Sequence, residues 1–394
     1  MKRSAAKKFI PYGRQSISPK DIRAVTEALR SDHLTTGPRV RQFEEKLAAY
    51  CGARFAVVCS SGTAALHLAC LALGLKEKDA IVTSPITFLA TANCARYVGA
   101  EVAFSDIDER TANLDPAKLS QTLGRTRRAK AVFPVHFAGQ PADMESISRI
   151  ARAKGLKIVE DACHALGASY KTKNGQTVKV GSCRHSDMSV FSFHPIKTIT
   201  TGEGGAVTTN DEKLRDRLFL FRNHGMQKKE GVGPWYYEMS EMGFNYRLTD
   251  IQCALGISQL ERADFFVRQR RKIARFYDES FAGSSTVTPL SDLHGAISSR
   301  HLYAVRINFK KLGQNRSGVM RALAWRGIGT QVHYIPVHLQ PYYKKRYGAR
   351  KGDLPAAEKY YEEALSLPLY PLMTMPAARK VTQEVGRICG QGRT

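Results

Sequence analysis

Residues 189–205, SVFSFHPIKTITTGEGG, place one lysine in a weakly charged setting between a β-type run and a glycine cluster. The run ends at Phe191, the polar residues Ser192 and His194 follow, and Lys197 comes next. The glycines after it let the backbone approach a neighbouring group closely. A lone lysine is most often a solvated surface charge, but in a semi-buried polar pocket its pKa falls and its amine can form a Schiff base. This stretch alone leaves both interpretations open.

The composition predicts a cytoplasmic globular protein. With 394 residues and 43% hydrophobic content, the chain can bury a large core and divide into two or three domains. No apolar run reaches the ~18 residues that cross a bilayer, and the basic N-terminus lacks the apolar region of a secretory signal. The 8 cysteines form no CxxC pair, which indicates reduced, buried thiols rather than a disulfide or zinc framework. We expect no membrane partner.

The charge balance is strongly basic, with 60 lysines and arginines against 35 acidic residues and a net charge of +25. Such a charge can indicate nucleic-acid binding. Here the basic clusters lie far apart in sequence and no DNA- or RNA-reading signature accompanies them. We therefore expect dispersed, solvated cations and no nucleic-acid partner, and an anionic small substrate would also suit some of this charge.

Outward from the lysine stretch, apolar runs and helical patterns alternate along the first two thirds of the chain. This alternation predicts βαβ units and a mostly parallel sheet, whose ligands bind at the carboxyl ends of the strands. The expected strands are residues 55–59, 80–83, 102–105, 131–135, 156–160, 188–191 and 206–208.

The remaining patterns predict three parts: an N-terminal arm (1–17), a large domain (18–262) and a smaller C-terminal α/β domain (263–394). A long helical pattern from Thr249 towards Phe276 would link the two domains. In the C-terminal part, residues 329–337 have the composition of a strand.

Two more polar clusters are expected just after strands. Residues 60–63, SSGT, lie between a strand and a helix, where backbone N–H groups and hydroxyls can bind a phosphate; ordinary helix capping is the alternative. Asp161 follows the strand LKIVE and could bind a metal, act as a base or hold a ring nitrogen. Only Glu160 and His164 lie nearby in sequence, so we expect no metal site.

The combination is more specific than its parts. A lysine, a strand-end carboxylate and a phosphate-binding turn are what pyridoxal 5′-phosphate requires: the lysine holds the aldehyde as an imine, the carboxylate keeps the pyridine nitrogen protonated, and the turn holds the phosphate. Phe88, after the strand 80–83, could stack on the ring, although an aromatic residue at a helix start usually packs in the core.

At this point the chain resembles a known family, the DegT/DnrJ/StrS-type sugar aminotransferases, which are pyridoxal-phosphate enzymes of fold type I. The resemblance runs from LTTGP (34–38) to SLPLYPLM (366–373). Within the family, the chain is most similar to the UDP-4-keto-6-deoxy-sugar C4 aminotransferases of the pseudaminic acid route. The motifs that carry the resemblance are SSGTAAL, PITFLATAN, EDACHALG, SVFSFHPIKTITTGEGGAV, FRNHGM, GFNYRLTDIQCALGISQL and VHYIPVHLQPYY.

The resemblance implies roles for individual residues. Lys197 would hold the cofactor and move the proton, Asp161 would pair with the pyridinium nitrogen, and His164 would contact the ring hydroxyl. Phe88 would cover the ring. The residues implied at the phosphate are Gly62, Thr63, Ala64 and Ser192.

The resemblance also implies residues that would contact the sugar substrate or the neighbouring subunit. Asn245, with Arg247 as a second candidate, would reach the phosphate of the neighbouring subunit, so the resemblance implies a homodimer with shared sites. Candidates for the nucleotide-sugar pocket, for which a packed strand with polar edges is the alternative, are Tyr12, Thr36, His333, Tyr334 and His338.

The implied reaction moves an amino group from L-glutamate to C4 of a UDP-linked 4-keto-6-deoxy-N-acetylhexosamine, in a route to a nonulosonic acid. Related sugar dehydratases have histidine at the lysine position, so Lys197 favours amino transfer. Two alternatives stay open: another nucleotide keto-sugar, such as a UDP-4-keto-arabinose or a dTDP-keto-hexose, or a non-catalytic basic binding protein on the same fold.

Overall fold

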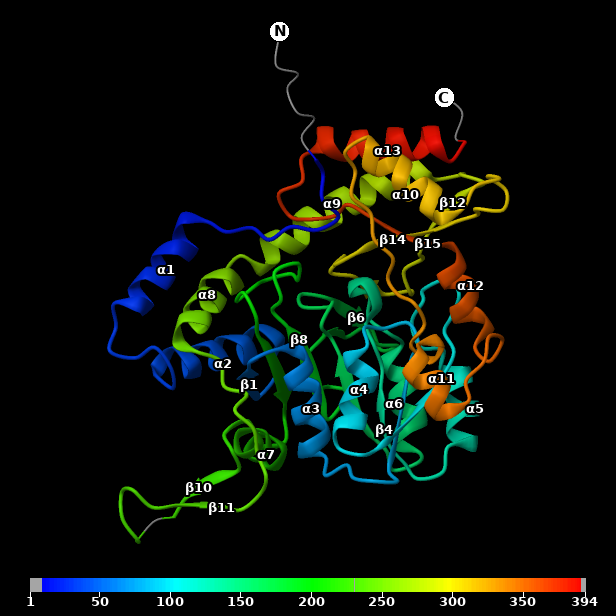
Figure 1. The fold of residues 1–394 in the computed structure, drawn as a ribbon. Coiled ribbons are helices and arrows are strands. Elements are labelled where there is room, and N and C mark those ends of the chain that lie inside the picture. The colour runs from blue at the N-terminus through cyan, green and yellow to red at the C-terminus, as the bar shows by residue number, and fades with distance from the viewer. Residues whose placement is uncertain (1–8, 230, 391–394) are drawn as a thin grey trace.

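A seven-stranded sheet flanked by helices forms the centre of the protein, which we describe from a computed structural model covering residues 9–229 and 231–390 (Figure 1). Neighbouring strands from β8 to β3 are parallel, while β9 runs antiparallel to both β1 and β8. The predicted mostly parallel α/β fold is confirmed. In sheet order the strands are β1 (Phe55–Cys59), β9 (Gly205–Thr209), β8 (Met188–Ser192), β5 (Lys157–Asp161), β4 (Ala129–Phe133), β2 (Ala80–Thr83) and β3 (Glu101–Phe104).

Helices cover both faces of this sheet because its strands are apolar on both sides. Successive residues of one strand, such as Val57 and Val58, belong to two different buried clusters. One cluster contains α2 (Pro38–Cys51), α5 (Pro116–Arg125), α6 (Met144–Arg152) and α8 (Asp250–Leu260). The other contains α3 (Gly62–Ala72), α4 (Ala90–Tyr97), α7 (Glu212–Arg222) and α11 (Pro341–Tyr347).

The C-terminal part builds a separate core around a three-stranded antiparallel sheet. Ile10 from the N-terminal segment joins this core by hydrogen bonds between its backbone and those of Gly327 and Gly329. The strands are β12 (Val287–Pro289), β14 (Tyr303–Ile307) and β15 (Ala364–Leu367), and the helices are α9 (Ala263–Phe281), α10 (Arg316–Trp325) and α13 (Met375–Ile388). The domain boundaries at 17 and 262 stay a prediction, and residues 1–8 of the expected arm lie outside the described residues.

Smaller elements complete the fold. A hairpin of β10 (Met226–Lys228) and β11 (Tyr237–Met239) projects from one side of the molecule (Figure 1). The remaining elements are α1 (Pro19–Leu29), α12 (Pro355–Glu363), the short helices η1 (Phe137–Gly139) and η2 (Val337–Leu339), and a sheet of β13 (Ala296–Ile297), β6 (Ser169–Lys171) and β7 (Thr177–Lys179). No helix in the described part of the chain is long and apolar enough to cross a membrane.

Two expectations about elements were wrong. The helical pattern from Thr249 to Phe276 forms two helices, α8 and α9, because Arg262 leaves helical geometry; its guanidinium lies 3.3 Å from the buried carboxylate of Asp21 on α1. Residues 329–337 form no strand: Gln331 makes one isolated bridge to Ser366, and the chain then continues as irregular backbone into η2.

Candidate active site

The carboxyl ends of β1, β5 and β8 open onto one cavity of about 390 Å³. Cys59, Ser192 and Gly205 lie in register across β1, β9 and β8, so the start of the reversed strand β9 lies at the same edge. A glycine is needed at position 205, since a Cβ there would lie 2.3 Å from the carbonyl oxygen of Ser61. The close approach predicted for the glycine cluster therefore falls directly beside the first turn of α3.

The N-terminus of α3 faces this cavity through Gly62 and Thr63. Ser61 caps the helix by accepting the amide N–H of Ala64 at 3.0 Å. The first N–H groups of a helix have no partner within it and favour an anion. A Cβ at Gly62 would lie 2.8 Å from the Cβ of Ser192, so the glycine lets the helix start pack against the end of β8.

Asp161 ends β5 with its carboxylate held in place by two hydrogen bonds. Its Oδ1 accepts the backbone N–H of Cys163 at 3.1 Å, and its Oδ2 accepts the hydroxyl of Thr91 at 2.6 Å. The Thr91 hydroxyl also pairs with the Thr87 hydroxyl at 2.7 Å. Because Thr91 gives its single proton to Asp161, Thr87 is the donor to Thr91. A hydroxyl chain therefore runs from Thr87 through Thr91 to the carboxylate.

Lys197 follows β8 in a turn closed by its own backbone N–H, which donates to the carbonyl of His194 at 2.9 Å. Its side chain lines the cavity. Burial lowers the pKa of the Lys197 amine, the neighbouring Cys163 and Asp161 oppose this shift, and the Arg270 guanidinium adds to the lowering. An amine with a lowered pKa is uncharged more often near neutral pH and is the better nucleophile.

Aromatic and imidazole groups form another part of the cavity wall. The ring of His164 stacks near Tyr334, whose hydroxyl lies 3.2 Å from His164 Nε2. Burial lowers the pKa of His164 well below its usual range and that of His333 to about 3, so both imidazoles are neutral at physiological pH. His164 Nδ1 is buried and has no hydrogen-bond partner within residues 9–229 and 231–390.

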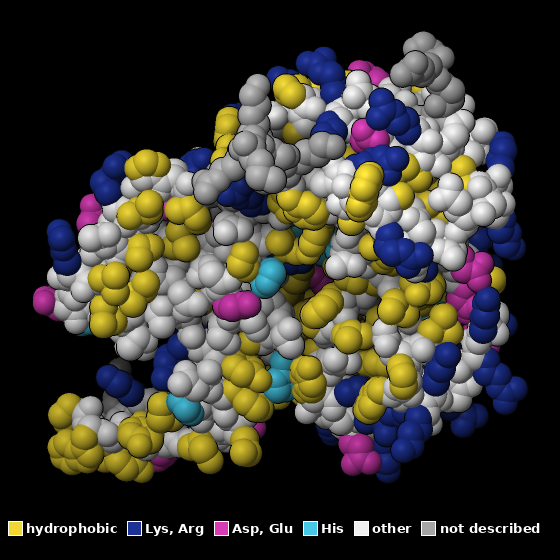
Figure 2. All heavy atoms as spheres, turned by 45° about the horizontal axis from the view of Figure 1, so that its top comes forward, with side chains coloured by type: hydrophobic (Ala, Val, Ile, Leu, Met, Phe, Trp, Pro, Cys, Tyr) yellow, Lys and Arg dark blue, Asp and Glu magenta, His cyan; other side chains and the backbone are white. Residues whose placement is uncertain are grey.

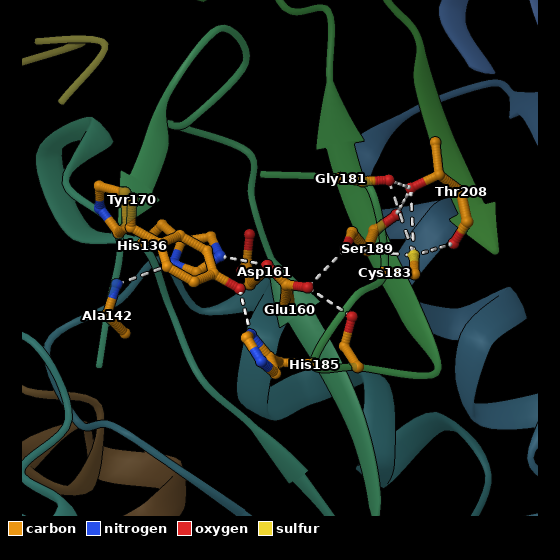
Figure 3. A network of polar contacts seen from close by, with 12 residues as sticks. His136, Ala142, Glu160, Asp161, Tyr170, Gly181, Cys183, His185, Ser189 and Thr208 are labelled. Carbon is orange, nitrogen blue, oxygen red and sulfur yellow. Dashed lines mark hydrogen bonds and ion pairs between the residues drawn. The ribbon is translucent and has the colours of Figure 1, made fainter. Parts of the chain in front are cut away.

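Glu160 supports the strand end from the opposite side of β5 (Figure 3). Its Oε2 accepts from His136 Nε2 at 2.7 Å, and its Oε1 accepts from Ser189 Oγ at 2.9 Å and from Ser186 Oγ. His136 Nδ1 accepts the amide of Ala142, which leaves the ring proton on Nε2. Burial alone would raise the pKa of Glu160, but these three donors hold it below the usual value.

Most residues predicted for the site lie on this one cavity. Glu203, which the sequence did not single out, lines it as well. The predicted residues that line it are Tyr12, Gly62, Thr63, Phe88, Asp161, His164, Ser192, Lys197, His333 and Tyr334. Phe88 precedes α4 with 57% of its surface exposed, so it lies at the cavity rather than in the core.

Five predicted residues lie elsewhere. Ala64 is buried in α3, and its amide is taken by the Ser61 cap. His338 is buried with its Nε2 3.0 Å from Glu358 Oε1, and it lines a different hollow of about 410 Å³. Thr36 and Arg247 line a separate hollow of about 470 Å³.

Asn245 lies next to that hollow: it pairs by a backbone bridge with Asn223, whose Oδ1 accepts from Arg247 Nη1 at 2.6 Å. Within one copy of the chain, these residues do not face Lys197.

Sequence reasoning missed three residues that act on this site. Thr87 and Thr91 stand four apart at a helix start in the quoted motif PITFLATAN, where that spacing places two hydroxyls on one face. Attention to that spacing could have found them. Arg270 lies inside the basic run RQRRKIAR, where nothing distinguishes a buried arginine from solvated neighbours.

The residues present fit pyridoxal 5′-phosphate. The cavity has an amine for the aldehyde, a fixed carboxylate for the ring nitrogen, helix amides for the phosphate and an unpartnered buried nitrogen on His164. No group of three or more metal-ligating side chains occurs among the described residues.

Fold and site together define a pyridoxal-phosphate-dependent transferase of fold type I. Residues 15–386 match the DegT/DnrJ/EryC1/StrS aminotransferase family, which is almost the whole chain. The protein therefore belongs to the DegT/DnrJ/EryC1/StrS aminotransferase family and is a sugar aminotransferase that uses pyridoxal 5′-phosphate.

Two curated relatives illustrate the range within the family. The UDP-4-amino-4,6-dideoxy-N-acetyl-beta-L-altrosamine transaminase of Campylobacter jejuni (serotype O:2) is 40% identical over 374 residues, covering 95% of this chain and 96% of the relative. The spore coat polysaccharide biosynthesis protein SpsC of Bacillus subtilis is 43% identical over 373 residues, covering 93% of each chain.

Two solved structures share the whole architecture. Helicobacter pylori PseC, described as an aminotransferase involved in the biosynthesis of pseudoaminic acid, superposes with a TM-score of 0.89 at 34% identity, covering 98% of this chain and 100% of its own. The PLP form of the putative sugar aminotransferase Spr1654 from Streptococcus pneumoniae has a TM-score of 0.89 at 28% identity, with coverage of 98% and 100%.

Proposed function

We propose that this enzyme transfers the amino group of L-glutamate to C4 of a UDP-linked 4-keto-6-deoxy-N-acetylhexosamine, giving a UDP-4-amino sugar for a nonulosonic acid such as pseudaminic acid. The observation that carries the proposal is the convergence of Lys197, Asp161 and the start of α3 on one cavity. The names of the Campylobacter relative and of PseC support the choice of sugar.

Lys197 is the group that would hold the cofactor and move the proton. Its buried amine has a lowered pKa, so near neutral pH it can attack an aldehyde and afterwards accept or return a proton at the reacting carbon. Bound pyridoxal 5′-phosphate supplies an electron-withdrawing ring that stabilises negative charge at that carbon. The protein supplies the Lys197 amine, which would carry the proton to and from that carbon.

Asp161 and His164 would fix and polarise the ring. The hydrogen bonds from Thr91 and from the Cys163 amide restrain the Asp161 carboxylate, so it presents one orientation towards a ring nitrogen. His164 is neutral and lines the cavity, and its buried Nδ1 has no hydrogen-bond partner among the described residues, which supports a contact with the ring hydroxyl. Gly62, Thr63 and Ser192 would bind the phosphate at the helix N-terminus.

The substrate sugar would lie between Phe88 and the residues Tyr12, His333 and Tyr334. Phe88 and Tyr334 approach with ring centroids 6.2 Å apart, and the ring of Tyr12 lies 5.8 Å from that of His333. These partly apolar surfaces suit the carbon faces of a deoxy-sugar. His333 Nδ1 lies 2.8 Å from the Ser366 hydroxyl, which fixes the imidazole orientation at the cavity wall.

The active enzyme is proposed to be a homodimer with shared sites. The β10–β11 hairpin exposes large apolar side chains, and Figure 2 shows hydrophobic side chains gathered over this projecting segment. Such a patch on a projecting element indicates a protein contact. Its apolar members with at least 48% of their surface exposed are Val232, Trp235, Tyr237, Met239 and Met242.

A second copy also gives a role to residues that lie away from the cavity of their own copy. Asn245 and Arg247 follow the hairpin in sequence and, with Thr36, border the separate hollow. In a symmetric dimer that hollow would lie beside the partner's cavity, where Asn245 and Arg247 would reach the cofactor phosphate of the other subunit.

A substrate panel tests the reaction. Purified holoenzyme with L-glutamate is offered the UDP-linked 4-keto-6-deoxy-N-acetylhexosamine, a UDP-4-keto-pentose and a dTDP-4-keto-hexose, and the amino sugar is measured by mass spectrometry. The proposal expects kcat/KM for the first sugar to exceed the others by at least about 100-fold, since a polar site rejects a substrate that lacks its matching groups. Equal or better use of another sugar would contradict it.

One alternative has its own support. SpsC is at least as similar in sequence as the Campylobacter transaminase, and its name places it in spore coat polysaccharide biosynthesis. Transfer to a different nucleotide keto-sugar is therefore the second candidate function. The same substrate panel separates the two.

A further inference from the structure

Arg270 is a buried cation placed directly behind the lysine segment. It lies on α9 with only 1% of its surface exposed. Its Nη1 donates to the carbonyls of His301 and Leu369, both at 2.9 Å, and its Nη2 donates to the carbonyl of Ile196 at 3.4 Å. Ile196 immediately precedes Lys197, so one guanidinium joins the lysine turn to two backbone segments of the C-terminal part.

The contacts around Arg270 extend to the cavity wall. The amide of Leu369 donates to the carbonyl of Tyr12 at 3.0 Å, and Gly13 packs near the side chain of Ile196, where a Cβ would lie 3.5 Å from Ile196 Cγ2. Arg270 therefore stands where the N-terminal segment, the lysine turn and the C-terminal core meet. A change at this residue affects the placement of all three.

Burying the Arg270 guanidinium costs folding free energy that a residue with only a packing role would not cost. Arg270 forms no ion pair with a carboxylate in the described part of the chain, and its Nε has no hydrogen-bond partner there. Burial lowers its pKa to about 10, so the guanidinium remains charged at neutral pH. An uncompensated buried charge destabilises a protein, and an apolar residue of similar length would avoid that cost.

The other titratable groups around the Lys197 amine carry little charge. Burial raises the pKa of the Cys163 thiol and lowers the pKa of the three nearby imidazoles. Of the remaining groups, Asp161 raises the pKa of the amine and Arg270 lowers it, and Glu203 lines the same cavity. The groups facing the amine from the surrounding elements are Asp161, Cys163, His164, Arg270, His301 and His333.

We propose that Arg270 is a positioning residue for Lys197: its guanidinium holds the Ile196–Lys197 turn against the C-terminal part and fixes a cation behind the lysine. The inference rests on the role proposed for Lys197 above. It adds a residue whose hydrogen bonds go to backbone carbonyls and which acts on the site by placing the lysine turn.

The test measures attachment of the cofactor rather than turnover. Apoenzyme is mixed with pyridoxal 5′-phosphate over a range of pH, where the Lys197 nitrogen bonds to the aldehyde carbon with loss of one water. The bond is trapped with borohydride and located by peptide mass spectrometry. The variants are Arg270→Met, Arg270→Lys and the control Arg271→Met, which removes the adjacent guanidinium that donates to the carbonyls of Ser298 and Gly167 instead.

Arg270→Met is expected to raise the pH midpoint for attachment by roughly one unit, which slows attachment at pH 7 about tenfold, while Arg271→Met matches the wild type. Arg270→Lys keeps the cation but loses the three-way bridge, so its midpoint is expected to stay near wild type while attachment is at least about threefold slower. Arg270→Met behaving like Arg271→Met would overturn the inference.

Circular dichroism shows whether Arg270→Met folds. If it does not, the test uses Arg270→Lys, and attachment of the cofactor to Arg270→Lys at the wild-type rate would overturn the inference. If the wild-type protein does not attach the cofactor at Lys197, the proposed function itself is contradicted.

Discussion

The orientation of the Asp161 carboxylate depends on two hydrogen bonds. A carboxylate at a strand end can rotate, but the Thr91 hydroxyl and the Cys163 amide each occupy one of its oxygens. The Thr87 hydroxyl in turn supports Thr91. The orientation of the group that would face the ring nitrogen is therefore set by hydrogen bonds from Thr91 and from the Cys163 amide.

Thr91→Val tests this chain while preserving side-chain shape. Loss of a hydrogen bond to a charged group is worth about 1.5–3 kcal/mol, so we expect pyridoxal 5′-phosphate to bind at least about tenfold more weakly. Absorbance titration of apoenzyme measures the affinity, and Thr91→Ser, which keeps the hydroxyl, serves as the control. Equal affinity in Thr91→Val and wild type would show that the hydroxyl chain does not matter.

At the scale of elements, the start of α3 and the end of β8 are fitted to each other. The missing side chain at Gly62 allows this contact, since an added Cβ would also lie 3.3 Å from the Cys163 sulfur. The anion-binding end of the helix is thus fixed relative to the lysine strand by packing alone.

Gly62→Ala is expected to push α3 away from Ser192, to cost about 1–3 kcal/mol of unfolding free energy, and to weaken cofactor binding. Thermal unfolding and absorbance titration measure both effects. Gly124→Ala in α5 is the matched control, because a Cβ there meets no atom within 4 Å and alanine favours a helix. Unchanged cofactor affinity in Gly62→Ala would show that the helix end does not hold the phosphate.

The sequence predicted elements well where local pattern decides them and poorly where tertiary contacts do. Apolar runs located β1 and β2, because a strand buried on both faces has a continuous apolar pattern. The direction of β9 depends on its partners rather than on its own residues. The break between α8 and α9 has no glycine or proline to signal it, and it falls at Arg262, whose guanidinium contacts Asp21 of a distant helix.

The same distinction applies to the site. Lys197, Asp161 and the SSGT turn could be predicted because each lies at or shortly after the carboxyl end of a strand of one sheet. The contact of His338 with Glu358 could not be foreseen because Glu358 comes from α12, and Arg270 was missed because its acceptors are carbonyls from three distant segments. Backbone acceptors leave no trace in a sequence.

At the scale of the whole molecule, the proposed dimer depends on the β10–β11 hairpin. Its exposed Trp235 and Met239 would be buried by a second copy, and loss of two such side chains is expected to raise the dissociation constant by at least about 100-fold. The double variant Trp235→Ser with Met239→Ser should therefore sediment as a monomer and lose transamination.

The matched control for the hairpin is Trp325→Ser on α10, which removes a tryptophan that is 87% exposed on a different part of the surface. We expect it to sediment like the wild type. A wild-type protein that is already monomeric and active in analytical ultracentrifugation would contradict the shared-site dimer.

The proposed function depends on Lys197 being the residue that holds the cofactor. The direct measurement is borohydride reduction of the purified, yellow holoenzyme followed by peptide mapping, with Lys197→Ala as the paired variant. We predict that the cofactor mass is found on the peptide containing Lys197, and that Lys197→Ala folds but loses the visible absorbance and at least about 10³-fold of its transamination rate. A cofactor bound to another lysine, or a Lys197→Ala protein that stays yellow and active, would contradict the account.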